Sequence, residues 1–326
     1  MMKSIAAWGS ICVVALVAGT APAQVPSADG QEVVAKVGDE PIYAAEVSRL
    51  LEKVTGRTKI NPAALPALKA QTLAEVVDRR LVLAYARRTK TGASPAELDA
   101  AWEKLKASLT AKGSSIEQFL KEQSMTEAEL RRQVDWNITW DKYLVKYVTD
   151  ARAEAYFNSH RRELDGSEVS VSHILLRAKA GAGPEATAEL LKQAQAIRQE
   201  IASGKLSFAE AAKKYSAGPS AEKGGELGLI SRHGPMVESF SRAAFALEIG
   251  QVSEPVTTPF GVHLIRCNEI KPGKKTLSDV RKQVDEGLAR ELLEKLAQQQ
   301  RPHTPVEFTG KWPHFQSGTR ELVTPK

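Results

Sequence analysis

The spacing of apolar residues changes near residue 166, and this change constrains the fold more than any other feature of the chain. From residue 44 to about 163, apolar side chains recur every three or four residues, as in Leu73, Val76 and Val77, which predicts amphipathic helices with one buried face. From residue 166 to 270, alternating and helical stretches occur together. We therefore expect an all-helical region followed by an α+β domain with the element order β-α-α-β-α-β-β.

Local signals place several helix ends and strands. The segments SPAEL and TEAEL each carry a capping box, Ser94 with Glu97 and Thr126 with Glu129, so we expect helices to begin there. A short extended element is expected at EVVAKVGDEPIY, ahead of the helices. The segment EVSVSHILL predicts a strand with two unlike faces, and one further amphipathic helix is expected after residue 271, followed by an extended stretch at PVEFTGKW.

The first 23 residues predict export from the cytoplasm. Lys3 precedes an apolar run, and the small-residue site Ala21-Pro22-Ala23 follows it, the pattern of a cleavable signal peptide. The apolar run is short for a membrane span, which takes about 20 residues, so an uncleaved anchor is the minor alternative. We expect no stable membrane anchor and a location in the periplasm or another extracytoplasmic compartment. Cleavage near Ala23 would leave Cys267 as the single cysteine, so no internal disulfide is expected.

Length and charge limit the remaining classes. The 326 residues are enough for about two domains. The formal net charge is +6, and basic and acidic residues are interleaved along most segments, which favours solvated surfaces and gives no clear signal for nucleic acid.

Two histidines, His173 and His263, lie inside apolar strand segments at the start and near the end of the α+β region. A buried histidine is commonly a satisfied core residue, but two in one small sheet can share a hydrogen bond if their strands are neighbours. No third ligand stands at metal-binding spacing, so neither a metal nor another cofactor is expected. Cys267 is too far along the same strand from His263 to act with it as a nucleophile.

The segment YSAGPSAEKGGELG contains four glycines and lies between apolar segments. It has neither the Lys-Ser/Thr ending of a P-loop nor the spacing of a dinucleotide fingerprint. A solvated turn and a loop beside a binding site both stay open for it.

Four segments, VSHILL, PSAEKGGELG, MVESFSRAAFAL and QVSEPVTTPFGVHLI, together resemble the parvulin (PpiC, rotamase) type of peptidyl-prolyl cis/trans isomerase. The flanking parts resemble secreted foldases and periplasmic chaperones that carry such a domain. The resemblance implies a multidomain α and α+β protein: a signal peptide (1–23), an N-terminal helical chaperone-like domain with a short β element (24–165), a parvulin domain with a small antiparallel sheet flanked by helices (166–270), and a C-terminal helix and tail that complete the N-terminal module (271–326).

The resemblance also assigns site residues. It implies a proline pocket formed by Leu227, Met236 and Phe240, and a hydrogen-bonded catalytic floor of His173, His263 and Thr258. The family's loop serine matches Ser216, which the resemblance adds to the catalytic residues, and Gly218, Gly224 and Gly225 belong to the loop beside the substrate. Many parvulins carry Cys or Asp where this chain has Gly218, and that side chain is thought to influence the electrostatics at the substrate carbonyl.

We therefore expect an extracytoplasmic prolyl isomerase that assists the folding of exported proteins. Its partners would be unfolded or nascent exported polypeptides with X-Pro bonds. The alternative is a chaperone without turnover that uses the parvulin domain as a peptide-binding module. A homodimer through the amphipathic helices also stays open.

Overall fold

The computed structural model describes residues 32–56, 65–178, 184–316 and 321–325. The predicted signal peptide lies outside them. The chain forms two compact units, one made of the residues up to Thr149 together with those from Gly287 onward, the other of Asp150–Glu286. The predicted 166–270 domain falls inside the second unit, and its limits stay a prediction.

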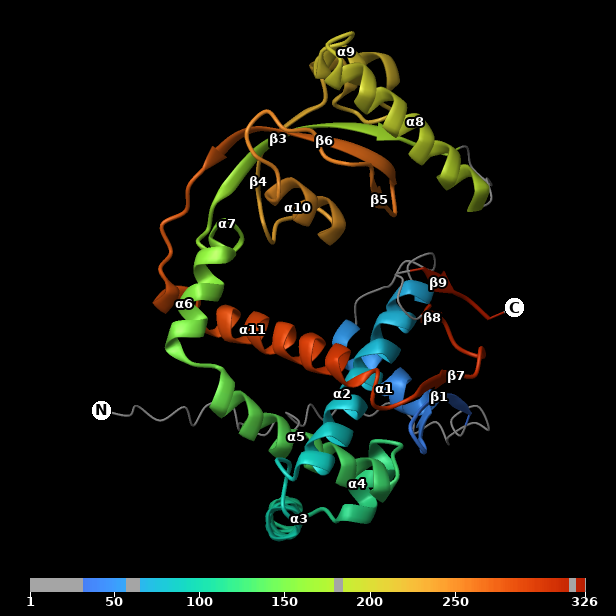
Figure 1. Cartoon of the computed structure of the whole chain (residues 1–326), viewed down its shortest axis with the longest axis vertical. Coiled ribbons are helices and arrows are strands. Elements are labelled where there is room, and N and C mark those ends of the chain that lie inside the picture. Colours follow the sequence, from blue (N-terminus) through green and yellow to red (C-terminus); the bar gives the residue numbers. More distant parts are fainter. Residues whose placement is uncertain (1–31, 57–64, 179–183, 317–320, 326) are drawn as a thin grey trace. The chain divides into compact units, whose positions relative to one another are not determined.

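The first unit is built mainly from helices around a small sheet (Figure 1). Its elements are β1 (Val33–Val37), β2 (Glu40–Tyr43), α1 (Ala44–Thr55), α2 (Leu65–Thr89), α3 (Pro95–Thr110), α4 (Ile116–Glu122), α5 (Glu127–Tyr147), the later part of α11 (Leu277–Gln300), β7 (Val306–Phe308), β8 (His314–Phe315) and β9 (Leu322–Val323). Both predicted capping boxes are present, at the starts of α3 and α5. The N-terminal hairpin is extended by β7 in the order β2-β1-β7, so the C-terminal segment completes the N-terminal sheet.

Helix α2 departs from the prediction of a single buried face. Besides Leu73, Val76 and Val77, the residues Val82 and Leu83 are also fully buried. The reason is its position, because α2 packs against α1, α5, β1 and β8, and a helix covered on several sides is apolar around much of its circumference. Leu296 and Ala297 of α11 join the same core.

The second unit contains α6 (Asp150–Ser159), α7 (Arg161–Leu164), β3 (Glu168–Leu176), α8 (Pro184–Ala202), α9 (Phe208–Tyr215), the 3-10 helix η3 (Ala221–Lys223), β4 (Glu226–Ser231), α10 (Glu238–Phe245), β5 (Val256–Thr258), β6 (Gly261–Lys271) and the start of α11. Its four strands form an antiparallel sheet in the order β4-β3-β6-β5. The expected order β-α-α-β-α-β-β is confirmed for residues 166–270, and the two histidine strands are neighbours at the centre of the sheet.

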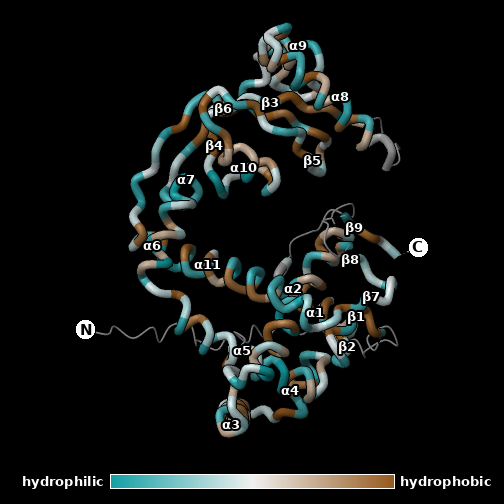
Figure 2. Tube along the Cα trace, viewed as in Figure 1, coloured by the Kyte–Doolittle hydropathy of each residue, from teal (hydrophilic) through white to brown (hydrophobic). Residues whose placement is uncertain are grey.

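Helices cover both faces of this sheet. Helix α10 packs on one face, against Val169, Val171, Ile265 and Cys267, while α8 and α9 lie on the other side of β3 and β6 (Figure 1). The predicted difference between the two faces of β3 holds only for its first half, because Ile174 and Leu176 pack with residues of α8 and α9. Ser172, on the polar side of the predicted pattern, is buried as well. Apolar residues consequently follow β3 and β6 along much of their length (Figure 2).

Candidate active site

The candidate site is built around His173 on β3 and His263 on β6. Both side chains are buried, with 7% and 5% of their surfaces exposed. Their Nδ1 atoms lie 3.2 Å apart, so the two imidazoles share the hydrogen bond that neighbouring strands allow. The Phe240 ring of α10 meets both imidazoles edge-on, at centroid distances of 5.9 Å from His173 and 5.4 Å from His263. The pair is thus held between the sheet and α10.

Thr258 extends this hydrogen-bonded chain. Its Oγ1 lies 2.8 Å from His263 Nε2 and accepts a hydrogen bond from the Phe260 N–H at 3.0 Å. Burial, reinforced by the neighbouring His173 and Arg177, lowers the pKa of His263 to about 4. Burial also lowers the pKa of His173. Both imidazoles are therefore neutral at neutral pH, and the floor of the site carries polar groups without net charge.

The three residues assigned to the proline pocket lie together. Phe240 is buried in the core cluster under α10, and Leu227 on β4 and Met236 before α10 pack against that cluster, half-buried. The structure thus brings His173, His263, Thr258 and the three apolar residues to one face of the sheet. Their roles in binding and catalysis stay a prediction.

The glycine-rich loop packs onto β3. The His173 N–H donates to the Gly225 carbonyl at 2.8 Å, and a Cβ on Gly225, whose φ is +82°, would lie 2.3 Å from the His173 carbonyl oxygen. Gly224 is left-handed at the end of η3. These glycines therefore allow the loop backbone to meet the histidine strand, a contact that the sequence analysis did not anticipate.

Ser216 and Gly218 lie at the start of the loop. Ser216 Oγ accepts hydrogen bonds from the N–H groups of Leu175 and Gly218, at 3.0 and 3.2 Å, so it joins the loop to the end of β3. A Cβ on Gly218 would lie 3.1 Å from His173 Nε2. Position 218 is therefore directly beside the histidine pair.

Sequence reasoning missed Phe260, which occupies the turn between β5 and β6. Its N–H is bound to Thr258, and 58% of its surface is exposed. A large apolar residue directly before Gly261, in the segment TTPFGVH, was the available signal. An exposed aromatic ring next to the site can contact an apolar part of a ligand.

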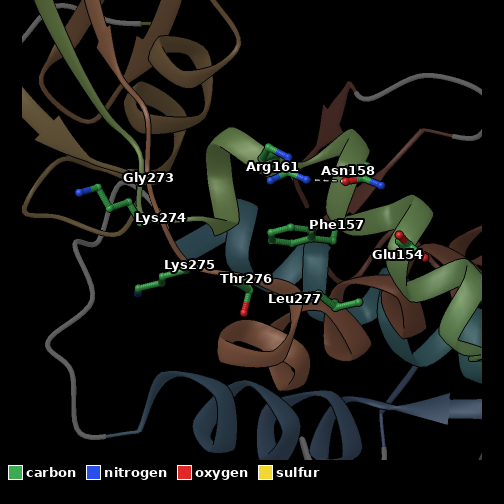
Figure 3. Close-up of a pocket in the computed structure, with 9 residues that line it drawn as sticks. All are labelled: Glu154, Phe157, Asn158, Arg161, Gly273, Lys274, Lys275, Thr276 and Leu277. Atoms are coloured by element: carbon green, nitrogen blue, oxygen red, sulfur yellow. Dashed lines mark hydrogen bonds between the residues drawn. The ribbon is translucent and has the colours of Figure 1, made fainter.

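A separate hollow of about 330 Å³ lies in the same unit, between α6 and the start of α11. Figure 3 shows its lining, including Phe157, Arg161 and the segment Gly273–Leu277. Neither histidine lines it. Within the described part of the chain, no group of three or more His, Cys, Asp or Glu residues could hold a metal ion.

Two protein-family models match parts of the chain. Residues 173–269 match the family model of the PPIC-type PPIASE domain, and residues 1–144 match that of the SurA-like N-terminal domain. The foldase protein PrsA of Bacillus subtilis is 28% identical over 248 residues, which cover 74% of this chain and 70% of that protein. The chaperone SurA of Cupriavidus metallidurans is 42% identical over 114 residues, covering 33% of this chain and 22% of that one. A crystal structure of the peptidylprolyl isomerase PrsA from Bacillus anthracis aligns at 25% identity with a TM-score of 0.36, over 71% of this chain and 96% of that chain.

The α+β unit thus carries a parvulin-type peptidyl-prolyl isomerase domain. The chain joins this domain to a SurA-like N-terminal domain, and its curated relatives include proteins named PrsA and SurA.

None of the helices in the described ranges is both long and apolar enough to cross a membrane.

Proposed function

We propose that the chain is an exported folding factor whose parvulin domain catalyses cis/trans isomerisation of X-Pro bonds in unfolded polypeptides. The observation that carries this proposal is the Thr258-His263-His173 hydrogen-bonded chain beside Phe240. Relatives of the chain are named as a foldase and a chaperone. In this proposal the helical N-terminal module holds the unfolded clients.

The chemistry required of such a site is small. Amide resonance opposes rotation with a barrier of about 18–20 kcal/mol, and no covalent bond has to break. A catalyst needs to bind the twisted amide more tightly than the planar one. Each ~1.4 kcal/mol of that preference raises the isomerisation rate about tenfold. In this proposal Leu227, Met236 and Phe240 hold the proline ring while the neutral polar floor faces the rotating amide.

The alternative is a chaperone that binds peptides at this site without turnover. Gly218 favours it, because no side chain at this position can act on the substrate carbonyl. Both hypotheses predict that the chain binds unfolded clients. Only the isomerase hypothesis predicts that it also accelerates prolyl isomerisation.

Refolding of a client limited by prolyl isomerisation tests the proposal. We expect the chain to accelerate the slow phase and Phe240→Leu to lose most of that effect while still suppressing aggregation. Phe208→Leu is the matched control, because Phe208 is similarly buried in the same domain but on the other side of the sheet. Equal losses in both variants, or no acceleration by the parent chain, would contradict the isomerase proposal.

We also propose that the protein is exported with cleavage of its signal peptide and that it is a monomer. Cleavage near Ala23 predicts that the protein recovered outside the cytoplasm begins at residue 24, which N-terminal sequencing tests.

The apolar faces of α1, α2 and the end of α11 join one core within the chain. This packing supports a monomer over the dimer alternative, and sedimentation equilibrium distinguishes the two.

A further inference from the structure

The short helix α7 is bonded to the region where α10, the helix that carries Phe240, ends. The Arg162 guanidinium donates to the carbonyls of Phe245 and Leu247, at 3.2 and 2.6 Å. The same guanidinium pairs with Glu248 at 3.0 Å. The last carbonyls of a helix have no partner inside the helix, so Arg162 supplies a donor where α10 ends.

At the start of α10, the contact with α7 runs through Arg232. Its Nε donates to Glu163 of α7 at 2.9 Å. Its Nη1 and Nη2 donate to the two carboxylate oxygens of Glu238, the first residue of α10, at 2.8 and 2.7 Å. The Arg232 side chain is 9% exposed, so these charge-assisted bonds are screened less than bonds at a free surface. Helix α7 therefore lies beside α10 and is bonded near both its ends (Figure 1).

Arg232 also closes the segment that carries Met236. Strand β4 ends at Ser231 and α10 begins at Glu238, so the Arg232 side chain joins the start of this connection to the helix that follows it. The N-cap of α10, Val237, makes no side-chain capping bond, so no local cap fixes the start of the helix. The path of the Met236 segment is thus held by this ion pair.

Helix α7 lies outside the part of the chain that the parvulin model matches. That match covers residues 173–269, whereas Arg162 and Glu163 precede it. The match therefore leaves α7 without a role, although its side chains are bonded to the elements that carry Met236 and Phe240.

We propose that Arg162, Glu163 and Arg232 are positioning residues of the isomerase, and that through them α7 holds two walls of the proline pocket, α10 and the Met236 segment. The proposal rests on the proposed function and deepens it, since it adds a support for the pocket from outside the matched domain. The three residues act through the pocket walls and do not contact the reacting amide.

A positioning role has a kinetic signature. The pocket holds the proline ring in the planar and in the twisted amide alike, so a displaced wall weakens the binding of both states, which raises KM and leaves kcat almost unchanged. Loss of folded protein has the opposite effect, because it lowers the concentration of active sites, and with it the apparent kcat, without changing KM. The two causes can therefore be distinguished in one set of measurements.

Two variants release α7 from α10. Glu163→Gln removes the charge that Arg232 Nε contacts, with little change in shape. Arg162→Met removes the donor at the end of α10 and keeps an unbranched side chain. Glu163→Gln is the milder change, so it keeps the test open if Arg162→Met fails to fold.

Arg198→Met is the matched control. Arg198 likewise donates to a backbone carbonyl, that of Ser253 at 3.1 Å, and pairs with a carboxylate, that of Glu254 at 2.8 Å. The side chains of Arg162 and Arg198 are 26% and 31% exposed. Arg198 anchors α8, however, and has no bond to α10 among the described residues.

The first measurement is isomerisation of a short Ala-Pro peptide by the whole chain. We expect Glu163→Gln and Arg162→Met each to raise KM at least about threefold, with kcat within about twofold of the parent. Arg198→Met should leave KM within about twofold. An unchanged KM in the two α7 variants, or an equal rise in Arg198→Met, would overturn the positioning role.

The second measurement does not depend on turnover. Labelling with ¹³C-methyl methionine gives a signal for Met236, and Met125, in the first unit, serves as an internal reference. We expect larger methyl motion at Met236 in Glu163→Gln than in the parent, with Met125 unchanged. Identical Met236 relaxation in parent and variant would overturn the inference.

Failure of the proposed function gives a different result. A parent chain that does not accelerate cis/trans exchange overturns the isomerase, and the Met236 signal then still decides whether α7 holds the pocket. A parent chain that accelerates exchange, together with α7 variants of unchanged KM, overturns only the positioning role.

Discussion

Replacing Gly225 by alanine tests the contact between the loop and the histidine strand. The added Cβ would lie 2.3 Å from the His173 carbonyl oxygen, at a φ of +82°. The left-handed backbone costs an L residue about 1–2 kcal/mol, and overpacking against backbone adds about 1–3 kcal/mol. We therefore expect Gly225→Ala to destabilise the parvulin domain by about 2–5 kcal/mol and to lower isomerase activity, since the loop has to move away from His173.

Gly250→Ala separates the two contributions. Gly250 has nearly the same φ, +84°, but a Cβ there would meet nothing within 4 Å, so only the conformational cost of about 1–2 kcal/mol is expected. Amide hydrogen exchange in β3 measures the opening free energy of this domain without reference to the other unit, and the His173 amide, bound to the Gly225 carbonyl, reports the contact directly. Equal effects of the two substitutions would refute the clash argument.

Three further predictions concern the same domain. The pKa of His263 falls from 6.5 to about 4 on folding, so the unfolded chain binds this proton first as the pH drops. The folded domain therefore has its full stability with respect to this group above about pH 6.5, and it loses up to about 3 kcal/mol of unfolding free energy as the pH falls toward 4. The urea midpoint, followed by the His263 ring signal, should fall over this range. A midpoint that does not change with pH would contradict the burial argument. Thr258→Val leaves His263 Nε2 buried without its partner and should destabilise the domain by about 1–3 kcal/mol, whereas Thr257→Val, at the exposed neighbour, should change stability little in the same urea titration. The Cys267 thiol is buried and burial raises its pKa, so it should react with a thiol reagent only as fast as the domain opens; rapid labelling of the native protein would count against its place in the core.

The elements that follow from local signals could be predicted closely. The strand expected from EVSVSHILL is β3, Glu168–Leu176, and the capping boxes at Ser94 and Thr126 begin helices as expected. The histidine pair could be anticipated as well, because two histidines in strands of one small sheet meet if the strands are neighbours. Patterns of this kind depend on residues close together in the sequence.

The rest depends on long-range packing, which no local pattern carries. The second half of β3 is buried on both faces because α8 and α9 lie over it. Helix α2 is likewise covered on several sides, because α1, α5, β1 and β8 pack against it. The proximity of Gly218 and Gly225 to His173 arises only when the loop folds back on β3. Composition suggested a permissive turn there, whereas the structure shows a loop that needs glycine to approach a particular carbonyl.

The most direct test of the central claim is two-dimensional exchange NMR on a short Ala-Pro peptide, with the chain and its His173→Ala, His263→Ala double variant compared at equal concentration. The account predicts faster cis/trans exchange with the parent chain and little or none with the variant. A folded parent chain that leaves the exchange rate unchanged would contradict it, and would make the parvulin domain a peptide-binding module of a chaperone.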